Sequence, residues 1–386
     1  MAAGAWWRGC PVGRLRTPTT DERVGADARV RGGTVKRIVI CCDGTWNRPD
    51  AASPTNVAKM ALAVADADGE TQQLVLYHRG VGTGRFDRVR GGAFGWGLSR
   101  NVRDCYRFVV EHFEPGDELF FFGFSRGAYT ARSTVGLIRN AGILRREHLD
   151  RVDAAYSLYR GRGDERRPTG IESTLFRRSY AHDEIAIRFV GVWDTVGALG
   201  IPGVPKRLCG RLWAFHDTEL SSKVALAYQA LAIDERRRPF VPSLWHRKPD
   251  DPGVLEQRWF AGVHSDVGGG YPDCSLAEIT LWWMAGRARE AGLALKPDHL
   301  VRVANPDGAE RRLGKEINPD VDGAPGRSYK GAYQLLGPHE RSLADPEDPN
   351  GRVAVASTAT DRSDYSAANL ERYLAARGPV AEVALG

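Results

Sequence analysis

Apolar residues fall into two recurring patterns along the chain: short continuous runs, and longer stretches in which every third or fourth residue is apolar. The first pattern is typical of strands buried on both faces, and the second of amphipathic helices. Strand-sized apolar runs lie within 36–42, 72–84, 118–127, 184–198 and 255–270. Helical spacing is found within 53–69, 98–117, 128–142, 221–235 and 275–292.

This alternation predicts an α/β fold with a mostly parallel sheet and helices on both faces, and we expect it to occupy residues 37–300. Residues 199–250 interrupt the alternation and are too long for a plain crossover. Because their helix at 221–235 is flanked by Pro and aromatic residues, we expect a cap insertion over the sheet at about 199–250. Residues 301–386 are rich in Gly, Pro and Asp, which predicts a loop-rich C-terminal segment packed on the same domain.

The positive charge of the chain is concentrated at its start. The formal net charge is +6, and residues 1–36 alone hold seven Arg or Lys against three Asp or Glu. This composition predicts a disordered basic extension. The remaining chain is nearly balanced in charge. It therefore does not indicate the basic folded face that nucleic-acid binders carry, and we expect no nucleic-acid partner.

Hydropathy and cysteine spacing exclude further classes of protein. No apolar run is long enough for a membrane-spanning helix, and the first residues lack the apolar core of a secretory signal. We therefore expect a cytoplasmic protein unless a specialised secretion system exports it. The six cysteines include no Cys-x-x-Cys pair, which is the spacing of many zinc sites and of thioredoxin-type sites. We expect no cofactor.

The sequence Gly123-Phe124-Ser125-Arg126-Gly127 lies between an apolar run and a helical stretch. Gly-x-Ser-x-Gly in that context is the pattern of a nucleophile elbow, in which a tight turn presents the serine at a helix N-terminus. The glycines permit the strand and the helix to approach closely, and the helix N-terminus can stabilise developing negative charge. We predict Ser125 as a nucleophile. The alternative is a Gly-rich turn that is structural or binds a nucleotide.

A nucleophilic serine needs a base that an acid holds in place. In α/β-hydrolases the acid and then the histidine follow the serine along the chain, each at the carboxyl end of a later strand. Asp194 and His264 each directly follow an apolar run, so we predict Asp194 as the acid and His264 as the base. His216 is the alternative base and Asp266 the alternative acid.

Backbone amides are expected to form the oxyanion hole of such a site. One is the amide after the nucleophile, that of Arg126. The other comes from the loop after the strand two before the elbow strand, which places it at Gly44 or Thr45. Asp43 precedes these residues, and we expect it to order the loop by hydrogen bonding to its own backbone.

Two other features suggest different chemistry. Asp43, His264 and Asp266 have side chains that suit several metal ions, although their spacing is not that of a tight ligand cluster. The glycines of 80–84 follow a predicted strand, but they lack the register of a dinucleotide-binding loop. Both features are weaker signals than the elbow.

Eight blocks of the sequence together resemble a known family, the catalytic domain of type VI secretion phospholipase effectors. The blocks occur in order as CCDGTWN (41–47), TNVAKM (55–60), YHRGVGTG (77–84), FFGFSRGAYTAR (121–132), GVWDTVGALG (191–200), FHDTELS (215–221), YQALAIDERRRPF (228–240) and WFAGVHSDVGGGY (259–271). The resemblance implies an α/β-hydrolase domain that cleaves the acyl esters of phospholipids, with a triad of Ser125, Asp194 and His264.

We therefore expect a serine hydrolase that acts on carboxylic esters, in particular on lipids, and that contacts the membrane surface peripherally. The alternatives are a hydrolase of small soluble esters or thioesters and a catalytically silent binding module. A lipid acyl chain needs an apolar groove near the nucleophile. The candidate wall residues are Trp46, Leu199, Ile201, Leu212, Trp213, Phe215, Phe240 and Trp245.

Overall fold

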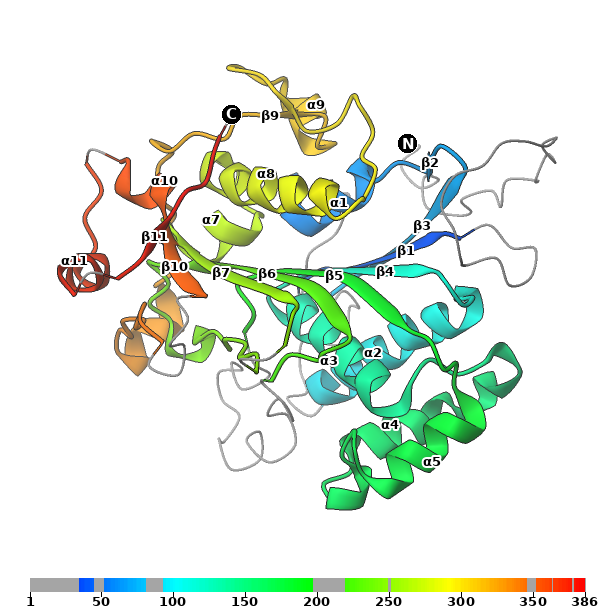
Figure 1. The fold of residues 1–386 in the computed structure, drawn as a ribbon. Coiled ribbons are helices and arrows are strands. Elements are labelled where there is room, and N and C mark those ends of the chain that lie inside the picture. The colour runs from blue at the N-terminus through cyan, green and yellow to red at the C-terminus, as the bar shows by residue number, and fades with distance from the viewer. Residues whose placement is uncertain are drawn as a thin grey trace. The chain divides into compact units, whose positions relative to one another are not determined.

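The computed structural model describes residues 35–44, 52–80, 93–196, 219–248, 251–345, 352–362, 364–376 and 378–385 (Figure 1). All of them lie in the unit that runs from Thr34 to Gly386. Of the basic extension predicted at 1–36, only Val35 and Lys36 are among the described residues.

Strands form the centre of this unit. They are β1 (Arg37–Cys42), β2 (Ala67–Asp68), β3 (Thr71–His78), β4 (Glu118–Phe124), β5 (Ala186–Trp193), β6 (Val224–Ala232), β7 (Val254–Phe260), β10 (Val353–Ala356) and β11 (Val380–Ala381). Two further short strands, β8 (Val301–Arg302) and β9 (Glu316–Ile317), pair with each other. The five predicted apolar strands correspond to β1, β3, β4, β5 and β7.

Within the described residues, nine strands form one sheet in the order β11-β10-β7-β6-β5-β4-β1-β3-β2. The pairings are parallel except that of β2 with β3. The mostly parallel α/β sheet predicted from the sequence is confirmed. Its strand order changes direction at β1, which lies between β3 and β4, and such a switch point is where open α/β sheets bind their ligands.

Helices cover both faces of the sheet (Figure 1). One face carries α1 (Asn56–Ala63), α7 (His264–Gly268) and α8 (Ser275–Glu290), and the other carries α2 (Ala93–His112), α3 (Arg126–Ala141), α4 (Val152–Arg160) and α5 (Ile171–Tyr180). Shorter helices are α9 (Gly308–Arg312), α10 (Ser357–Thr360) and α11 (Ala368–Ala375), with 3₁₀ turns at Arg146–Arg151, Asp164–Arg166, Arg238–Phe240 and Gly331–Leu336. None of the helices described is long and apolar enough to span a membrane.

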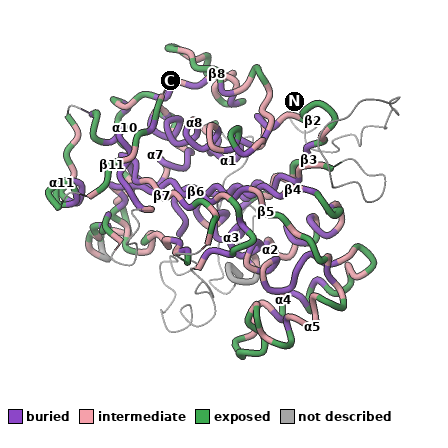
Figure 2. Tube along the Cα trace, viewed as in Figure 1, coloured by how far each residue is buried: buried purple, intermediate pink, exposed green. Residues whose placement is uncertain are grey.

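The central strands are buried on both faces, and Figure 2 shows them in purple. Side chains alternate between the two sides of a strand. Ile38 and Ile40 of β1 accordingly pack into the core between the sheet and helices α2 and α3. Val39 and Cys41 pack into the core on the opposite face, between the sheet and helices α1 and α8. Burial on both faces explains why these strands are continuous apolar runs rather than alternating ones.

The prediction of a helix at 221–235 is wrong, because Val224–Ala232 forms strand β6. Its sequence VALAYQALA is apolar at most positions and rich in Ala, so its spacing fits a helix as readily as a strand. Pairing with β5 and β7 decides the outcome. A cap over the whole of 199–250 is therefore also wrong, since the middle of that segment extends the sheet. Residues 199–218 lie outside the described residues.

The described part of 301–386 contains many loops and also contributes to the sheet. Strand β10 pairs with β7, and β11 pairs with β10. A buried ion-pair cluster joins this segment to the helices above the sheet: Glu278 of α8 contacts Lys59 of α1 at 2.6 Å and Arg311 of α9 at 2.7 Å. These contacts connect three elements that are distant in sequence.

Candidate active site

Ser125 lies between β4 and α3 in a backbone conformation that L-residues rarely adopt, with φ 56° and ψ −120°. The flanking glycines make this turn sterically possible. A Cβ atom on Gly123 would lie 2.6 Å from Cα of Ala128, and one on Gly127 would lie 2.1 Å from the carbonyl oxygen of Cys42. The strand, the strained turn and the helix together have the geometry of a nucleophile elbow.

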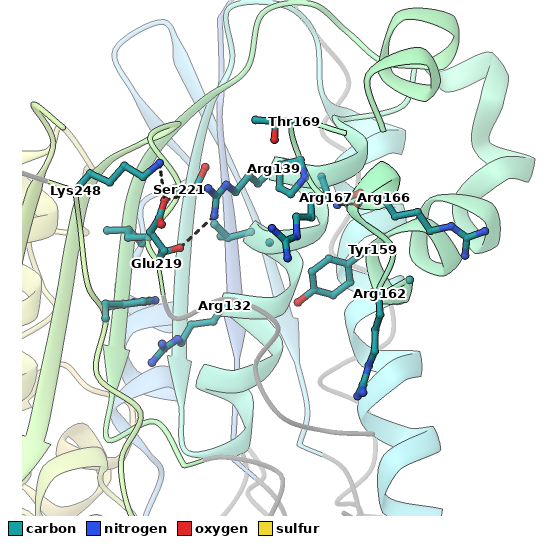
Figure 3. A pocket seen from close by; sticks show the side chains of 18 residues that line it. Arg132, Arg139, Tyr159, Arg162, Arg166, Arg167, Thr169, Glu219, Ser221 and Lys248 are labelled. Carbon is teal, nitrogen blue, oxygen red and sulfur yellow. Dashed lines mark hydrogen bonds and ion pairs between the residues drawn. The ribbon is translucent and has the colours of Figure 1, made fainter. Parts of the chain in front are cut away.

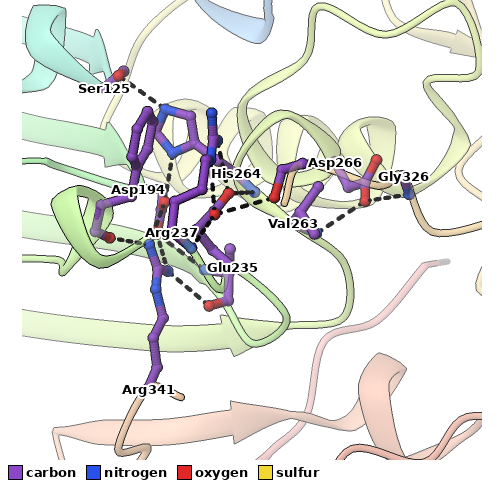
Figure 4. A network of polar contacts seen from close by, with 12 residues as sticks. Ser125, Asp194, Glu235, Arg237, Val263, His264, Asp266, Gly326 and Arg341 are labelled. Carbon is purple, nitrogen blue, oxygen red and sulfur yellow. Dashed lines mark hydrogen bonds and ion pairs between the residues drawn. The ribbon is translucent and has the colours of Figure 1, made fainter. Parts of the chain in front are cut away.

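Ser125, His264 and Asp194 form a continuous chain of hydrogen bonds (Figure 4). Nε2 of His264 lies 2.8 Å from Oγ of Ser125, and Nδ1 lies 2.6 Å from Oδ2 of Asp194. All three residues are buried. They follow β4, β7 and β5 respectively, so they meet at the carboxyl edge of the sheet. The structure thus brings together the three residues that the sequence predicts as a triad.

Asp194 is fixed in place by several hydrogen-bond donors. It directly follows β5 with φ 38°, and its amide donates to the carbonyl oxygen of Ala230 at 2.7 Å. Its Oδ1 accepts from the amide of Ala232 at 3.1 Å. Burial by itself raises the pKa of this carboxyl, but the Arg341 charge and the His264 hydrogen bond outweigh that effect and hold the pKa well below its usual range. Asp194 is therefore ionised at neutral pH.

His264 opens the short helix α7 and lies between two aromatic rings. The Phe124 ring centroid is 4.6 Å from that of the imidazole, and the Phe240 ring meets it edge-on at 4.9 Å. Burial lowers the pKa of His264, and the hydrogen bond to Asp194 opposes but does not cancel this effect. The imidazole is therefore neutral at pH 7, which is the form a general base needs. With Asp194 ionised, the proton on the imidazole is assigned to Nδ1.

Two charged groups beside the triad were not predicted from the sequence. Arg341 is buried and donates to both carboxylate oxygens of Asp194, as well as to the carbonyl oxygens of Ala232 and Phe240. Glu235 is also buried, accepts from the amide of His264 at 3.3 Å and forms an ion pair with Arg237 at 2.7 Å. Glu235 and Arg237 fall within one of the resembling blocks, whereas nothing in the sequence around Arg341 indicates its role.

The exit of β1 lies against the elbow, where the second oxyanion donor was predicted. Gly127 approaches the carbonyl oxygens of Cys42 and Asp43. The Gly44 amide, one of the two candidates, donates to Oδ1 of Asp43 at 2.6 Å. That hydrogen bond argues against Gly44 as an oxyanion donor, and Thr45 lies outside the described residues. Arg126 opens α3, where backbone N–H groups point out of the helix N-terminus.

Asp43 and Asp266 each have a structural role in this site. Asp43 orders the loop after β1, because besides Gly44 it also accepts from the hydroxyls of Thr55 and Tyr77. Asp266 accepts from the amides of Val263 and Gly326 at 2.9 and 2.8 Å, so it caps its own helix and does not hold the imidazole. The acid contacting His264 is Asp194 instead, and the alternative assignment of Asp266 is not supported.

The metal alternative is not supported either. Asp43, His264 and Asp266 each bind their own protein partners, and the part of the chain that the structure describes contains no group of three or more His, Cys, Asp or Glu suited to a metal ion.

Most of the predicted groove lies outside the described residues, as does the alternative base His216. The groove residues concerned are Trp46, Leu199, Ile201, Leu212, Trp213 and Phe215. Phe240 is described and contacts His264. The prediction for Trp245 is not supported: it is buried in the hydrophobic core, where its backbone is hydrogen-bonded to the side chain of Gln257 in β7.

The chain is similar to several known proteins. One curated relative, the uncharacterized protein YEL023C of Saccharomyces cerevisiae, is 30% identical over 226 residues, which cover 53% of this chain and 32% of that protein. The chain thus spans about a third of the length of that relative.

Two solved structures are also similar, each with a TM-score of 0.39. One is an uncharacterized protein from Pseudomonas aeruginosa, 18% identical, with 68% of this chain and 46% of that chain covered. The other is the Tle1 effector bound to the VgrG spike from the type 6 secretion system, 21% identical, with 67% and 56% covered.

A family model covers the whole region that forms the candidate site. The model is described as the T6SS phospholipase effector Tle1-like catalytic domain, and it matches residues 36–287, well over half of the chain. Ser125, Asp194 and His264 all fall inside this match. The chain belongs to the family of Tle1-like catalytic domains of type VI secretion phospholipase effectors.

Proposed function

We propose that this protein is a serine hydrolase that cleaves the carboxylic esters of lipids, with Ser125 as nucleophile, His264 as general base and Asp194 as the acid that orients the base. The observation that carries the proposal is the chain of hydrogen bonds of 2.8 and 2.6 Å through His264, which begins at a serine on a strained elbow. Membership of a phospholipase family supports the lipid part of the proposal.

In the proposed reaction, Oγ of Ser125 attacks the ester carbonyl while its proton passes to Nε2 of His264. Asp194 accepts the Nδ1–H hydrogen bond, which fixes the reactive tautomer and stabilises the imidazolium as it forms. The imidazolium then gives its proton to the departing alcohol, leaving an acyl group on Ser125. Water, activated by the neutral His264, releases the acid in a second round of the same steps.

Negative charge develops on the former carbonyl oxygen and needs hydrogen-bond donors that are already in place. We assign one donor to the amide of Arg126 at the N-terminus of α3. We assign the other to Thr45, because the Gly44 amide donates to Asp43 and the exit of β1, at Cys42 and Asp43, lies against the elbow. Removing one such donor typically costs about 10²–10³ in kcat.

The surroundings of the reacting atoms favour an apolar substrate. Phe124 and Phe240 contact the imidazole, and Ser125 is only 6% exposed. Transfer of each methylene of an acyl chain from water into apolar surroundings contributes about 0.8 kcal/mol. An enzyme that uses this contribution should prefer longer acyl chains.

The experiment is a series of p-nitrophenyl esters from acetyl to octanoyl, measured below the critical micelle concentration. We expect kcat/KM to rise with acyl length, and we expect Ser125→Ala to abolish turnover while the melting temperature stays within a few degrees. Equal or better turnover of the acetyl ester would replace the lipid proposal with a hydrolase of small soluble esters. Full activity in Ser125→Ala would refute the serine mechanism.

A further inference from the structure

A cavity of about 550 Å³ lies between α3, the loop before α5 and the segments that flank β6 (Figure 3). It is not part of the catalytic edge. Ser221 precedes β6 and Lys248 precedes β7, so both wall segments lie at the amino ends of strands, whereas Ser125 and Asp194 lie at the carboxyl ends. A ligand in this cavity would therefore leave the triad unobstructed.

The wall of the cavity is strongly basic. Among the residues that the structure describes, six cationic side chains and one carboxylate, that of Glu219, line it. The cationic residues are Arg132, Arg139, Arg162, Arg166, Arg167 and Lys248. Glu219 pairs with both Arg139 and Lys248, at 3.3 and 3.4 Å. Like charges gathered around one cavity repel each other, and an anion in the cavity would offset that repulsion.

Two of these arginines also pair with carboxylates outside the cavity. Arg167 pairs with Asp164 at 3.0 Å, and Arg166 pairs with Glu172 at 2.8 Å. The side chains of both pairs are about half exposed or more, and exposed pairs of this kind contribute roughly 0–1 kcal/mol.

The donors around the cavity suit a tetrahedral anion. Figure 3 shows the side chains of Arg139, Arg167 and Tyr159 around the same space, whereas that of Arg166 extends away from it. Guanidinium groups present two parallel N–H donors that match phosphate oxygens. Burial raises the pKa of the Tyr159 hydroxyl, so this group stays protonated. Burial lowers the pKa of Arg132 to about 9, a desolvation cost that a bound anion would reduce.

The helix next to the cavity adds an apolar feature. Helix α5 begins directly after the lining residue Thr169, and its Ile171 and Leu175 are 62% and 54% exposed. They are the most exposed large hydrophobic side chains among the described residues. Basic residues beside exposed apolar ones are typical of surfaces that bind an anionic membrane interface.

We propose that this cavity binds a phosphate group, carried either by a small soluble molecule or by the head group of an anionic lipid. The cavity volume falls within the range of ligand pockets and is larger than phosphate alone requires. The site is separate from the proposed triad, so its test does not depend on whether the protein is a serine hydrolase.

The first arm of the test measures the affinity of the full chain for sodium phosphate by isothermal titration calorimetry. The ionic strength is kept constant with sodium chloride. The variant is the double substitution Arg139→Gln/Arg167→Gln, and the matched control is Arg312→Gln, an exposed arginine of α9 outside the cavity. We expect the double variant to bind phosphate at least tenfold more weakly than the wild type, and the control to bind it equally.

The second arm identifies the source of the phosphate. Lipid binding by the same three proteins is measured by flotation with phosphatidylcholine vesicles. The vesicles contain either no phosphatidate or about 20 mol% phosphatidate, which gives them an anionic surface. Binding to phosphatidate that the double variant loses would assign the site to a lipid head group. Phosphate binding without pocket-dependent vesicle binding would assign it to a soluble phosphate compound.

Two results would overturn the proposal. One is phosphate affinity that is the same in the double variant as in the wild type, which would mean an adventitious ion only. The other is a combined result: the wild type binds no phosphate at concentrations up to about 10 mM, and the double variant binds the vesicles as well as the wild type does. The melting temperature and the turnover of a soluble ester serve as folding controls, because neither substituted arginine contacts the triad.

Discussion

Arg341 donates two hydrogen bonds to the carboxylate of Asp194, at 2.7 Å to Oδ1 and 3.0 Å to Oδ2. Both residues are buried. Since Oδ2 of that carboxylate also contacts Nδ1 of His264, Asp194 connects a permanent cation to the imidazole. The arginine thus neutralises part of the charge that would otherwise raise the pKa of His264.

We expect Arg341→Met to lower the free energy of unfolding by about 3–5 kcal/mol, because it leaves a buried carboxylate without its cationic partner. If Asp194 shifts as a result, kcat/KM should fall by about tenfold to a hundredfold. Denaturant unfolding and steady-state kinetics measure the two effects.

A purely structural role for Arg341 would leave the pH profile unchanged, so the profile is the discriminating measurement. Without the Arg341 charge, Asp194 stabilises the imidazolium more strongly, and the acid limb of kcat/KM should move to higher pH. Arg341→Lys retains a cation and should keep the limb near its original position. As a control, Arg372→Met removes an exposed partner of Glu340 and should cost about 0–1 kcal/mol.

The wild-type pH dependence follows from the direction of the His264 shift. The proposed mechanism needs the neutral imidazole, and burial lowers its pKa below the ordinary value of 6.5. The rate should therefore fall as pH drops through a midpoint below 6.5, and more than half of the maximal kcat/KM should remain at pH 6.5. A midpoint above 6.5 would mean that Asp194 outweighs burial.

The elbow should not tolerate a side chain at Gly127. A Cβ atom there would lie 2.1 Å from the carbonyl oxygen of Cys42, which is backbone and cannot rotate away. We expect Gly127→Ala to lower the unfolding free energy by about 1–3 kcal/mol and to reduce activity strongly. The matched control is Gly286→Ala in α8, where a Cβ atom meets nothing within 4 Å. That substitution should stabilise the protein by about 0.5–1 kcal/mol.

Glu278 should be essential to the packing of the C-terminal segment. It contacts Lys59 and Arg311, and Lys59 is only 1% exposed. Glu278→Gln leaves that lysine charge buried without its partner, which should cost about 3–5 kcal/mol in urea unfolding. Glu290→Gln, on the same helix, removes an exposed partner of Arg287 and should cost about 0–1 kcal/mol. Equal effects of the two substitutions would contradict this account.

Local signals made the elbow and its partners predictable. Gly123 and Gly127 bracket Ser125 because the turn leaves no room for side chains, and Asp194 and His264 directly follow strongly apolar runs. These signals depend on neighbours in sequence. The carboxyl ends of parallel strands then bring the residues to one edge of the sheet.

Features set by tertiary contacts could not be predicted in the same way. Strand β6 has apolar residues at nearly every position, so its period does not distinguish a strand from a helix until β5 and β7 pair with it. Arg341 is 147 residues from Asp194 and lies in a loop-rich segment without any periodic pattern. Its position depends on how that segment folds back over the end of β5.

The central claim is that Ser125 is a nucleophile activated by His264, and a fluorophosphonate probe tests it most directly. After reaction of the intact protein, peptide mass spectrometry locates the adduct. We predict a single adduct on Ser125, none in Ser125→Ala, and labelling of His264→Ala slowed by at least about 10³-fold, since the triad acts as a unit. An unlabelled wild-type protein, or an adduct on another residue that persists in Ser125→Ala, would contradict the account.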